Sequence, residues 1–298
     1  MSSIQDTSGT TVNAAIAVPT GVTREDFARQ VRSADRRVRM RRLLRGGTGV
    51  AVILVVWQLM SQWLDLELLL PPPLTVLHDL VVILLVSDPH WLYGPNIYVH
   101  LWYSFLRAMA GFGGAAVVAI PMGLVLGRIV AIREFVMPSI KGIYPIPGIA
   151  WIPLAILWFG LGNAAVIFVV FATTFFPMLF STEAGARQIS PTIIDAGRCF
   201  GARGMTLFFR VVLPATIPYI ITGLRISLGG AWRMIVAGEM LASQDGIGYF
   251  LMESRFQFKA VDLMTAMILV AIVGYATEKL IVDTIEKRTL EKWEVRPS

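Results

Sequence analysis

The sequence predicts an all-α integral membrane protein with about six transmembrane helices, and two observations lead to this prediction. Charged residues make up only 15% of the chain and the mean hydropathy is +0.66, whereas a soluble domain carries about 25% charged residues. In addition, residues 108–127 and 142–182 contain no charged residue. A bilayer core of about 30 Å is crossed by about 20 apolar residues in a helix. Uncharged runs of this length therefore favour membrane spans over a buried core helix.

Six spans account for the apolar segments. The first uncharged run supplies one span, and the second is long enough for a helical hairpin, which Gly160-Leu161-Gly162-Asn163 would interrupt near its middle. The segment Leu74–Val86 is too short to cross a bilayer and follows three prolines, so we expect an interfacial helix outside the membrane. The predicted spans are residues 46–64, 102–127, 136–159, 164–182, 215–238 and 262–283.

Residues 1–45 form a basic N-terminal extension ahead of a transmembrane domain at residues 46–298. The first part has the composition of a disordered segment, and arginines interspersed with apolar residues follow between Arg24 and Arg45. This pattern is typical of an amphipathic helix on an anionic membrane surface or of a topogenic anchor, and we prefer the anchor. Both interpretations place the N-terminus in the cytoplasm, and no cleavable signal peptide is predicted.

The distribution of Lys and Arg predicts the orientation of the spans. No Lys or Arg occurs between residues 64 and 106, whereas the loops at 128–141 and 183–214 and the C-terminal tail are basic. Lys and Arg stay on the cytoplasmic side of a membrane, so both termini of this multi-pass protein are expected in the cytoplasm. Arg255 and Lys259 are the exception and must lie outside. Because the basic residues border apolar segments, the net charge of +6 indicates contact with membrane lipid and not with nucleic acid.

The loop at residues 183–214 is predicted to carry a short cytoplasmic helix. Ser190-Pro191 is an N-cap and first-turn pair, and a helix that starts there would end at Gly204. Such a helix is suited to dock into a groove of another protein, although an ordinary amphipathic surface loop fits the pattern as well. One face, with a shallow notch at its two glycines, would carry Ile193, Gly197, Phe200 and Gly201.

The same loop resembles the EAA signature of ABC importer permeases, in which Glu-Ala-Ala is followed by three residues, Gly, nine residues, Ile, one residue and Leu-Pro. Every spacing is kept here, with Asp in place of Glu, Gly in place of the second Ala, and Val211 in place of Ile. All three replacements are conservative in charge or size. The resemblance assigns coupling to an ATPase to Asp195, Ala196, Gly197, Phe200, Gly201, Leu213 and Pro214.

The resemblance covers residues 68–295 and is to the branch of these permeases that imports sulfonates, taurine, nitrate and bicarbonate. It implies a type I ABC importer permease-like fold in the bacterial inner membrane, with a coupling helix seated on a cytoplasmic ABC ATPase. It also implies a second permease chain, in a homodimer around a central pathway, and an extracytoplasmic substrate-binding protein that delivers a small anion. The segments that carry the resemblance include Leu70-Pro71-Pro72-Pro73, Trp151-Ile152-Pro153 and Gly246-Ile247-Gly248-Tyr249.

Charged residues inside the predicted spans are the candidates for the translocation pathway, because such charges are costly in lipid. Arg225 belongs to the family's Gly-Leu-Arg pattern and is expected to pair with a neighbouring carbonyl or carboxylate. Arg233, next to Trp232, fits an anionic solute or a structural ion pair equally well. Glu239 could pair with Arg233 only if the helix unwinds, so we expect it to act as a gate or docking residue.

Other functions have less support. The sequence has no Gly-x-x-x-x-Gly-Lys-Ser/Thr loop, so the chain is expected to need no cofactor, and ATP and Mg²⁺ would bind the partner ATPase. It has no recognisable catalytic set, so we predict no enzyme. His78, His90 and His100 match no metal-site spacing and are expected to be solvated. The alternative is a gradient-driven secondary transporter or channel, which would have no use for a docking helix.

Overall fold

The structure is a computed structural model that describes residues 47–49, 51–63, 69–85 and 96–290. The chain divides into two compact units, residues 1–65 and 66–298. In the first unit the described residues are helical and coincide with most of the predicted first span, whose positions 46, 50 and 64 lie outside the described residues. The predicted N-terminal extension at residues 1–45 also lies outside them.

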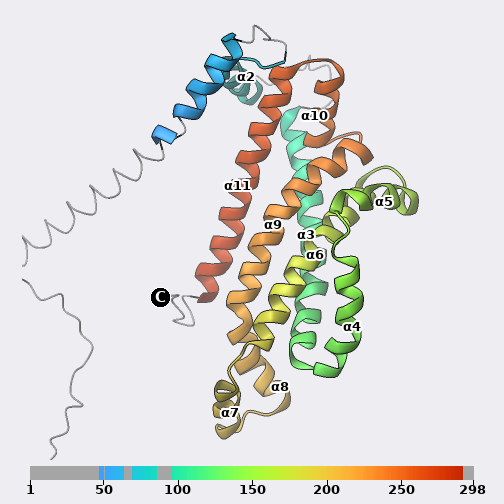
Figure 1. The fold of residues 1–298 in the computed structure, drawn as a ribbon, viewed down its shortest axis with the longest axis vertical. Helices are drawn as coiled ribbons and strands as arrows, with labels where there is room; N and C mark the ends of the chain where they lie inside the picture. Colours follow the sequence, from blue (N-terminus) through green and yellow to red (C-terminus); the bar gives the residue numbers. More distant parts are fainter. Residues whose placement is uncertain (1–46, 50, 64–68, 86–95, 291–298) are drawn as a thin grey trace, which may run out of the picture. The chain divides into compact units, whose positions relative to one another are not determined.

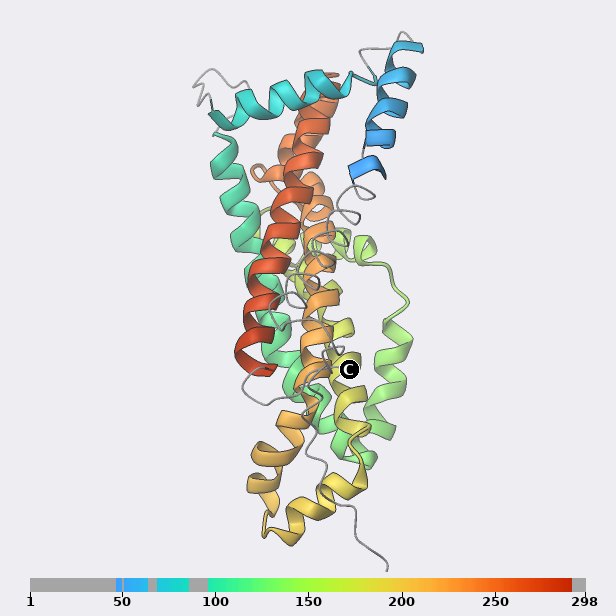
Figure 2. The same cartoon turned by 90° about the vertical axis from the view of Figure 1, so that its left-hand side faces the viewer.

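The second unit is helical throughout its described residues, with no strand among them (Figure 1). Long helices α3, α6, α9 and α11 pack side by side, and α7 and α8 lie at the opposite end of this unit from α2 and α10 (Figure 2). We refer to these ends as the α7 end and the α10 end. The elements are α2 Pro73–Leu85, α3 Ile97–Arg128, α4 Val130–Ile143, the 3₁₀ turn η1 Gly148–Ala150, α5 Trp151–Phe159, α6 Asn163–Arg187, α7 Pro191–Cys199, α8 Gly204–Leu207, the π-helical η2 Phe208–Val212, α9 Leu213–Ala242, α10 Ile247–Phe256 and α11 Ala260–Leu290.

Four described helices are long and apolar enough to cross a membrane: α3, α6, the continuous segment Gly204–Ala242, and α11. They correspond to four of the predicted spans. The predicted span at residues 136–159 is not one straight helix, because α4 and the η1–α5 segment meet at an angle of 82°. Pro145 and Pro147 lie in the break, and each removes a backbone donor that a continuous helix would need. Together the two pieces make a fifth, bent span or a re-entrant loop.

The predicted hairpin within residues 142–182 is present as α5 and α6, separated at the expected glycines. Gly160 and Gly162 adopt φ values of +75° and +127°, which side chains with a Cβ rarely tolerate. The Gly162 N–H donates to the Ala242 carbonyl at 2.7 Å. This bond fixes the turn of the hairpin against the end of α9.

Helices α3 and α6 touch along a seam of small residues. A Cβ atom at Gly111 would lie 2.7 Å from Val170 Cβ, and one at Gly123 would lie 2.7 Å from Thr182 Cβ. Atoms do not pack that closely, so only glycine permits this backbone separation. At Gly113 an added Cβ would meet nothing within 4 Å. Glycines therefore allow α3 and α6 to approach closely along this seam, whereas Gly113 lies away from it.

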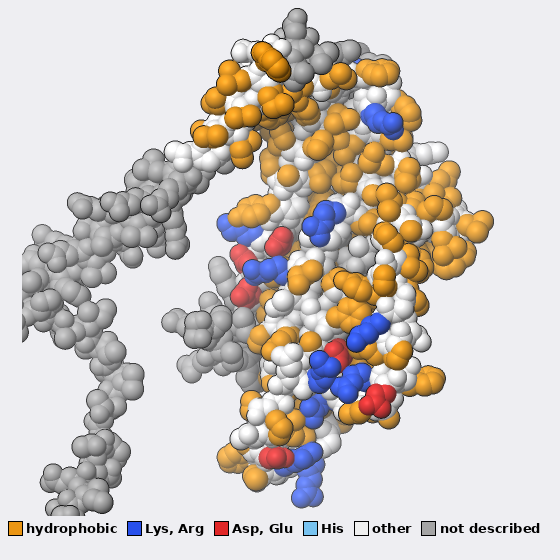
Figure 3. Space-filling view, in the orientation of Figure 1, with side chains coloured by type: hydrophobic (Ala, Val, Ile, Leu, Met, Phe, Trp, Pro, Cys, Tyr) orange, Lys and Arg blue, Asp and Glu red, His pale blue; other side chains and the backbone are white. Residues whose placement is uncertain are grey.

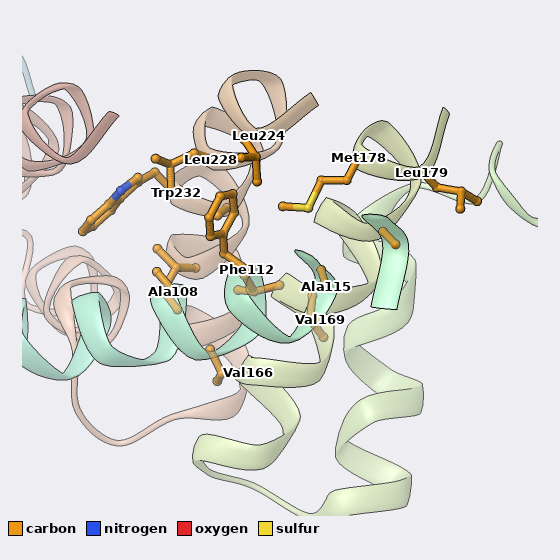
Figure 4. Packing of buried hydrophobic residues seen from close by; sticks show 14 of the residues in the cluster. Ala108, Phe112, Ala115, Val166, Val169, Met178, Leu179, Leu224, Leu228 and Trp232 are labelled. Carbon is orange, nitrogen blue, oxygen red and sulfur yellow. The ribbon is translucent and has the colours of Figure 1, made fainter. Parts of the chain in front are cut away.

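The main hydrophobic core lies where α3, α6 and α9 meet. Its buried side chains interdigitate across the three helices, with Phe112 and Ala115 from α3 between Val169 from α6 and Leu228 from α9 (Figure 4). The same cluster reaches Trp232, which is 4% exposed. The core thus places the middle of α9, with its charged residues, at a fixed height against α3 and α6.

The seam predicts opposite effects for two glycine-to-alanine changes in α3. Gly123→Ala should lower the melting temperature of the detergent-purified protein, because overpacking of this kind costs about 1–3 kcal/mol. Gly113→Ala should leave it unchanged or raise it, because alanine is favoured over glycine inside a helix by about 1 kcal/mol. Equal melting temperatures for the two variants would contradict the seam.

Candidate functional site

The predicted coupling loop forms a small helical lobe at the α7 end, made of α7, α8 and η2 (Figure 1). Pro191 occupies the first turn of α7, as the sequence predicted. The Ser190 side chain makes no capping hydrogen bond, and the Ser190 carbonyl instead accepts from the Ile193 N–H at 3.0 Å. A small core of Ile189, Ile194 and Val212 holds the lobe together.

A left-handed glycine ends α7 earlier than predicted. Gly201 has a φ of +82°, its N–H donates to the Arg198 carbonyl at 2.9 Å, and the Ala202 N–H donates to the Gly197 carbonyl at 3.0 Å. This pair of bonds is the Schellman pattern, which satisfies carbonyls that a helix end leaves free. The prediction that Gly204 ends the helix is wrong, because Gly204 begins α8.

The two glycines of the loop do not form a shared notch. A Cβ at Gly197 would lie 2.9 Å from Val211 Cγ2 and 3.1 Å from Leu207 Cδ1, so this glycine lets α7 pack against α8 and η2. A Cβ at Gly201 would meet nothing within 4 Å, so this glycine is required by the turn. The expected common face is therefore wrong, because one position faces inward and the other lies beyond the helix.

Large apolar side chains remain exposed on the lobe. Phe200, at the end of α7, is 92% exposed, and Asp195 and Ala196 are exposed on α7 itself. Asp195 pairs with Arg198 at 3.2 Å on the surface. Leu213 and Pro214 begin α9 and are partly buried, so they join the lobe to the long helix. Other exposed apolar residues of the lobe are Ile193, Met205 and Phe209.

A buried ionic cluster lies at the α10 end. Arg107 from α3 donates to Glu239 from α9 at 2.8 Å, to Asn163 at the start of α6 at 2.6 Å, and to the Asp245 carboxylate. The Arg107 side chain is 5% exposed and that of Glu239 is 0% exposed. Sequence reasoning missed Arg107, although an arginine one position before an uncharged run was a usable signal.

Glu239 also holds the start of α10. It accepts from Ser104 Oγ at 2.7 Å and from the Gly248 N–H at 3.0 Å. His100 Nδ1 accepts from the Gly246 N–H at 2.9 Å. His100 is 1% exposed, so the expectation that it is solvated is wrong. Glu239 does not pair with Arg233 in this arrangement, because the α3 guanidinium takes that place.

The two remaining charged candidates lie on the face of α9 that meets α11. Arg225 donates to Glu286 at 2.6 Å and lies 3.5 Å from Asp283, so the expected carboxylate partner is present. Arg233 and Trp232 line a groove of about 420 Å³ between α9 and α11, together with Glu278. Neither the ionic cluster nor this groove resembles a metal centre, and no metal-binding group of His, Cys, Asp or Glu occurs among the described residues.

Comparisons with known proteins agree on one family. A family model described as binding-protein-dependent transport system inner membrane component matches residues 117–291. A putative ABC transporter permease of Methanocaldococcus jannaschii is 32% identical over 77% of this chain and 85% of its own length. The taurine transport system permease of Escherichia coli is 33% identical over 78% of this chain and 83% of its own length. A nitrate import permease of Synechocystis is 31% identical over 80% of this chain and 87% of its own length.

A solved structure shares the fold. A chain of the MetNI methionine ABC transporter, in an inward-facing conformation, superimposes with a TM-score of 0.56 over 63% of this chain and 95% of its own length. Its sequence identity to this chain is 19%. The all-helical type I importer permease arrangement predicted from the sequence is thus confirmed at the level of the fold.

The ionic cluster predicts a large loss of stability when its cation is removed. Arg107→Gln should lower the free energy of unfolding by about 3–5 kcal/mol, because it leaves a buried carboxylate without its partner. Arg198→Gln breaks only an exposed pair and should cost about 0–1 kcal/mol. Thermal melts of the purified variants measure both. Adding Glu239→Gln to Arg107→Gln should recover part of the loss, and no recovery would argue against the pairing.

Proposed function

Because this chain belongs to the family of binding-protein-dependent transport system inner membrane components, we propose that it forms the translocation pathway of an importer for a small anion. It is a permease subunit of an ABC importer, as its relatives are. The proposed solutes are of the sulfonate, taurine, nitrate or bicarbonate type. Relatives that carry taurine and nitrate support this range.

The observation that carries the coupling part of the proposal is the lobe at the α7 end. An almost fully exposed phenylalanine at the end of a short helix is what an interface uses as an anchor. The spacing from Asp195 to Pro214 matches the EAA pattern, and the residues of that pattern lie on or next to the lobe. We infer that α7 seats in a groove of a cytoplasmic ABC ATPase, which binds ATP and Mg²⁺.

The observation that supports an anionic solute is Arg233. Arg233 is an exposed residue within α9, and a charge stranded in lipid costs about 2.5–3.5 kcal/mol on the insertion scale. It must therefore face water, a carboxylate or a solute. A second permease chain, in the proposed homodimer, would supply the other wall of the pathway, and an extracytoplasmic substrate-binding protein would deliver the solute.

The alternative of a gradient-driven transporter has less support from the structure. Proton or sodium coupling uses an acid within the membrane that can change its charge or its partner. Glu239 is such a buried acid, but it is engaged by Arg107, Ser104 and the start of α10. A docking lobe would also serve no purpose in a transporter that has no ATPase.

The proposal predicts that Phe200→Ser uncouples the importer. Loss of an aromatic anchor costs about 2 kcal/mol, or about thirtyfold in the Kd for the ATPase, so co-purification of the ATPase and solute uptake should fall together. Phe256→Ser, at the α10 end and 63% exposed, is the matched control for co-purification. Gly201→Trp should have the same effect as Phe200→Ser, because it strains the left-handed turn. Normal ATPase binding by both lobe variants would contradict the docking assignment.

The charge distribution predicts that the α7 end and both termini lie in the cytoplasm. Lys and Arg gather over the part of this face nearest α7 and α8 (Figure 3). Cys199 on α7 is exposed and is the chain's only cysteine. A membrane-impermeant maleimide should label it only after the cells are permeabilised. His78→Cys in a Cys199→Ser background should be labelled in intact cells, and the reverse pattern would overturn the orientation.

A further inference from the structure

Beside the groove between α9 and α11 lies a buried indole N–H, that of Trp232, which has no acceptor among the described residues. Trp232 is 4% exposed, and its Nε1 has no hydrogen-bond partner within the described part of the chain. The indole extends away from Phe112 and Met178 of the core (Figure 4) and lines the groove. Gly274 of α11 makes room for it, because a Cβ there would lie 3.3 Å from Trp232 Cγ. An indole N–H can only donate, and a polar group bound in the groove beside the ring could supply the acceptor that the described residues do not.

The same groove contains a cation and an acid that do not pair. Arg225 and Glu286 form a closed ion pair between α9 and α11. Arg233 and Glu278 lie eight residues further along α9 and eight residues back along α11, about two turns on both helices, so the antiparallel register sets them at a corresponding height. Both line the groove, yet among the described residues no ion pair within 4.0 Å joins them.

We propose that the α9–α11 groove binds a small zwitterion, with its anionic group on Arg233 and Trp232 and its ammonium group on Glu278. This inference rests on the proposed function and narrows its solute. The planar guanidinium suits a sulfonate or carboxylate, and the indole N–H adds a second donor to the same group. Val236 and Val270 line the groove as well and offer an apolar surface to the methylene groups between the two charges.

The carboxylate of Glu278 disfavours an inorganic anion as the ligand of this groove. A nitrate or bicarbonate ion held by Arg233 would share the groove with the Glu278 carboxylate and gain nothing from it. A like charge in one site is repelled, whereas an ammonium group is attracted. A groove of about 420 Å³ also leaves room for an organic chain beside the charged group. A short ω-amino acid with a sulfonate or carboxylate satisfies the indole, the guanidinium and the carboxylate at once.

Equilibrium binding to the assembled permease–ATPase complex in lipid nanodiscs, without the substrate-binding protein, tests this site. Radiolabelled taurine is the probe, and unlabelled ethanesulfonate and β-alanine are competitors. Taurine should bind saturably, and ethanesulfonate, which lacks the ammonium group, should compete at least about tenfold more weakly, as expected for loss of a charged hydrogen bond. If β-alanine competes as well as unlabelled taurine, the site accepts a carboxylate and a sulfonate equally. If β-alanine competes more weakly, the site prefers a sulfonate.

The variants separate the site from the rest of the complex. Trp232→Phe and Arg233→Gln should each weaken taurine binding by about tenfold, and Glu278→Gln should abolish the preference for taurine over ethanesulfonate. Glu286→Gln, an acid two turns away on α11, is the matched control and should bind as the unmodified protein does. Absence of saturable binding in an intact complex, or unchanged binding in these three variants, would overturn the site. Such a result would not contradict the proposed function. The proposed function would be contradicted if no ATPase co-purified with the chain.

Discussion

The buried charge of Arg107 constrains the whole α10 end of the transmembrane unit. A guanidinium without partners is far too costly in an apolar interior, so the chain must bring carboxylates to it from distant parts of the sequence. Glu239 arrives on α9 and Asp245 on the segment that follows it, while Asn163 begins α6. Ser104 and His100 then bind the first N–H groups of α10. Three helices therefore begin or end beside this one cation: α6 and α10 begin there and α9 ends there, while α3 runs past it.

Much of the fold was accessible from the sequence because its signals are local. Uncharged length located the long helices, glycines located the turn between α5 and α6, and Ser190-Pro191 located the start of α7. The bend between α4 and α5 was missed because several spans contain prolines, and only at Pro145 and Pro147 does the chain fail to continue as a helix. Pro121, Pro177 and Pro218 lie inside unbroken helices. A proline therefore permits a break, and tertiary packing decides whether one occurs.

The candidate sites were predictable to different degrees, because some depend on neighbouring residues in the sequence and others on contacts between distant helices. The lobe follows from a contiguous stretch of about thirty residues, and its position between two spans could be inferred from residue spacing alone. The partner of Glu239 could not be inferred in this way, because Arg107 is separated from it by 132 positions in the sequence. The open pair in the α9–α11 groove likewise depends on the register between two helices. The expected notch at Gly197 is wrong because a small residue that faces a partner and one that faces its own lobe look identical in sequence.

The segment Gly204–Ala242 is one uninterrupted helical path of 39 residues, through α8, η2 and α9. At about 1.5 Å per residue it is roughly 58 Å long, nearly twice the thickness of a hydrocarbon core of about 30 Å. One piece of secondary structure thus connects the surface that an ATPase would grip with the groove and the buried ions. No loop interrupts this segment, and the only change in helix type between the lobe and α9 is the wider π-helical turn at η2. A movement of the lobe would therefore be passed on to α9. Because the helix is continuous, a rotation of the lobe would also rotate α9 and change which of its side chains meet α11.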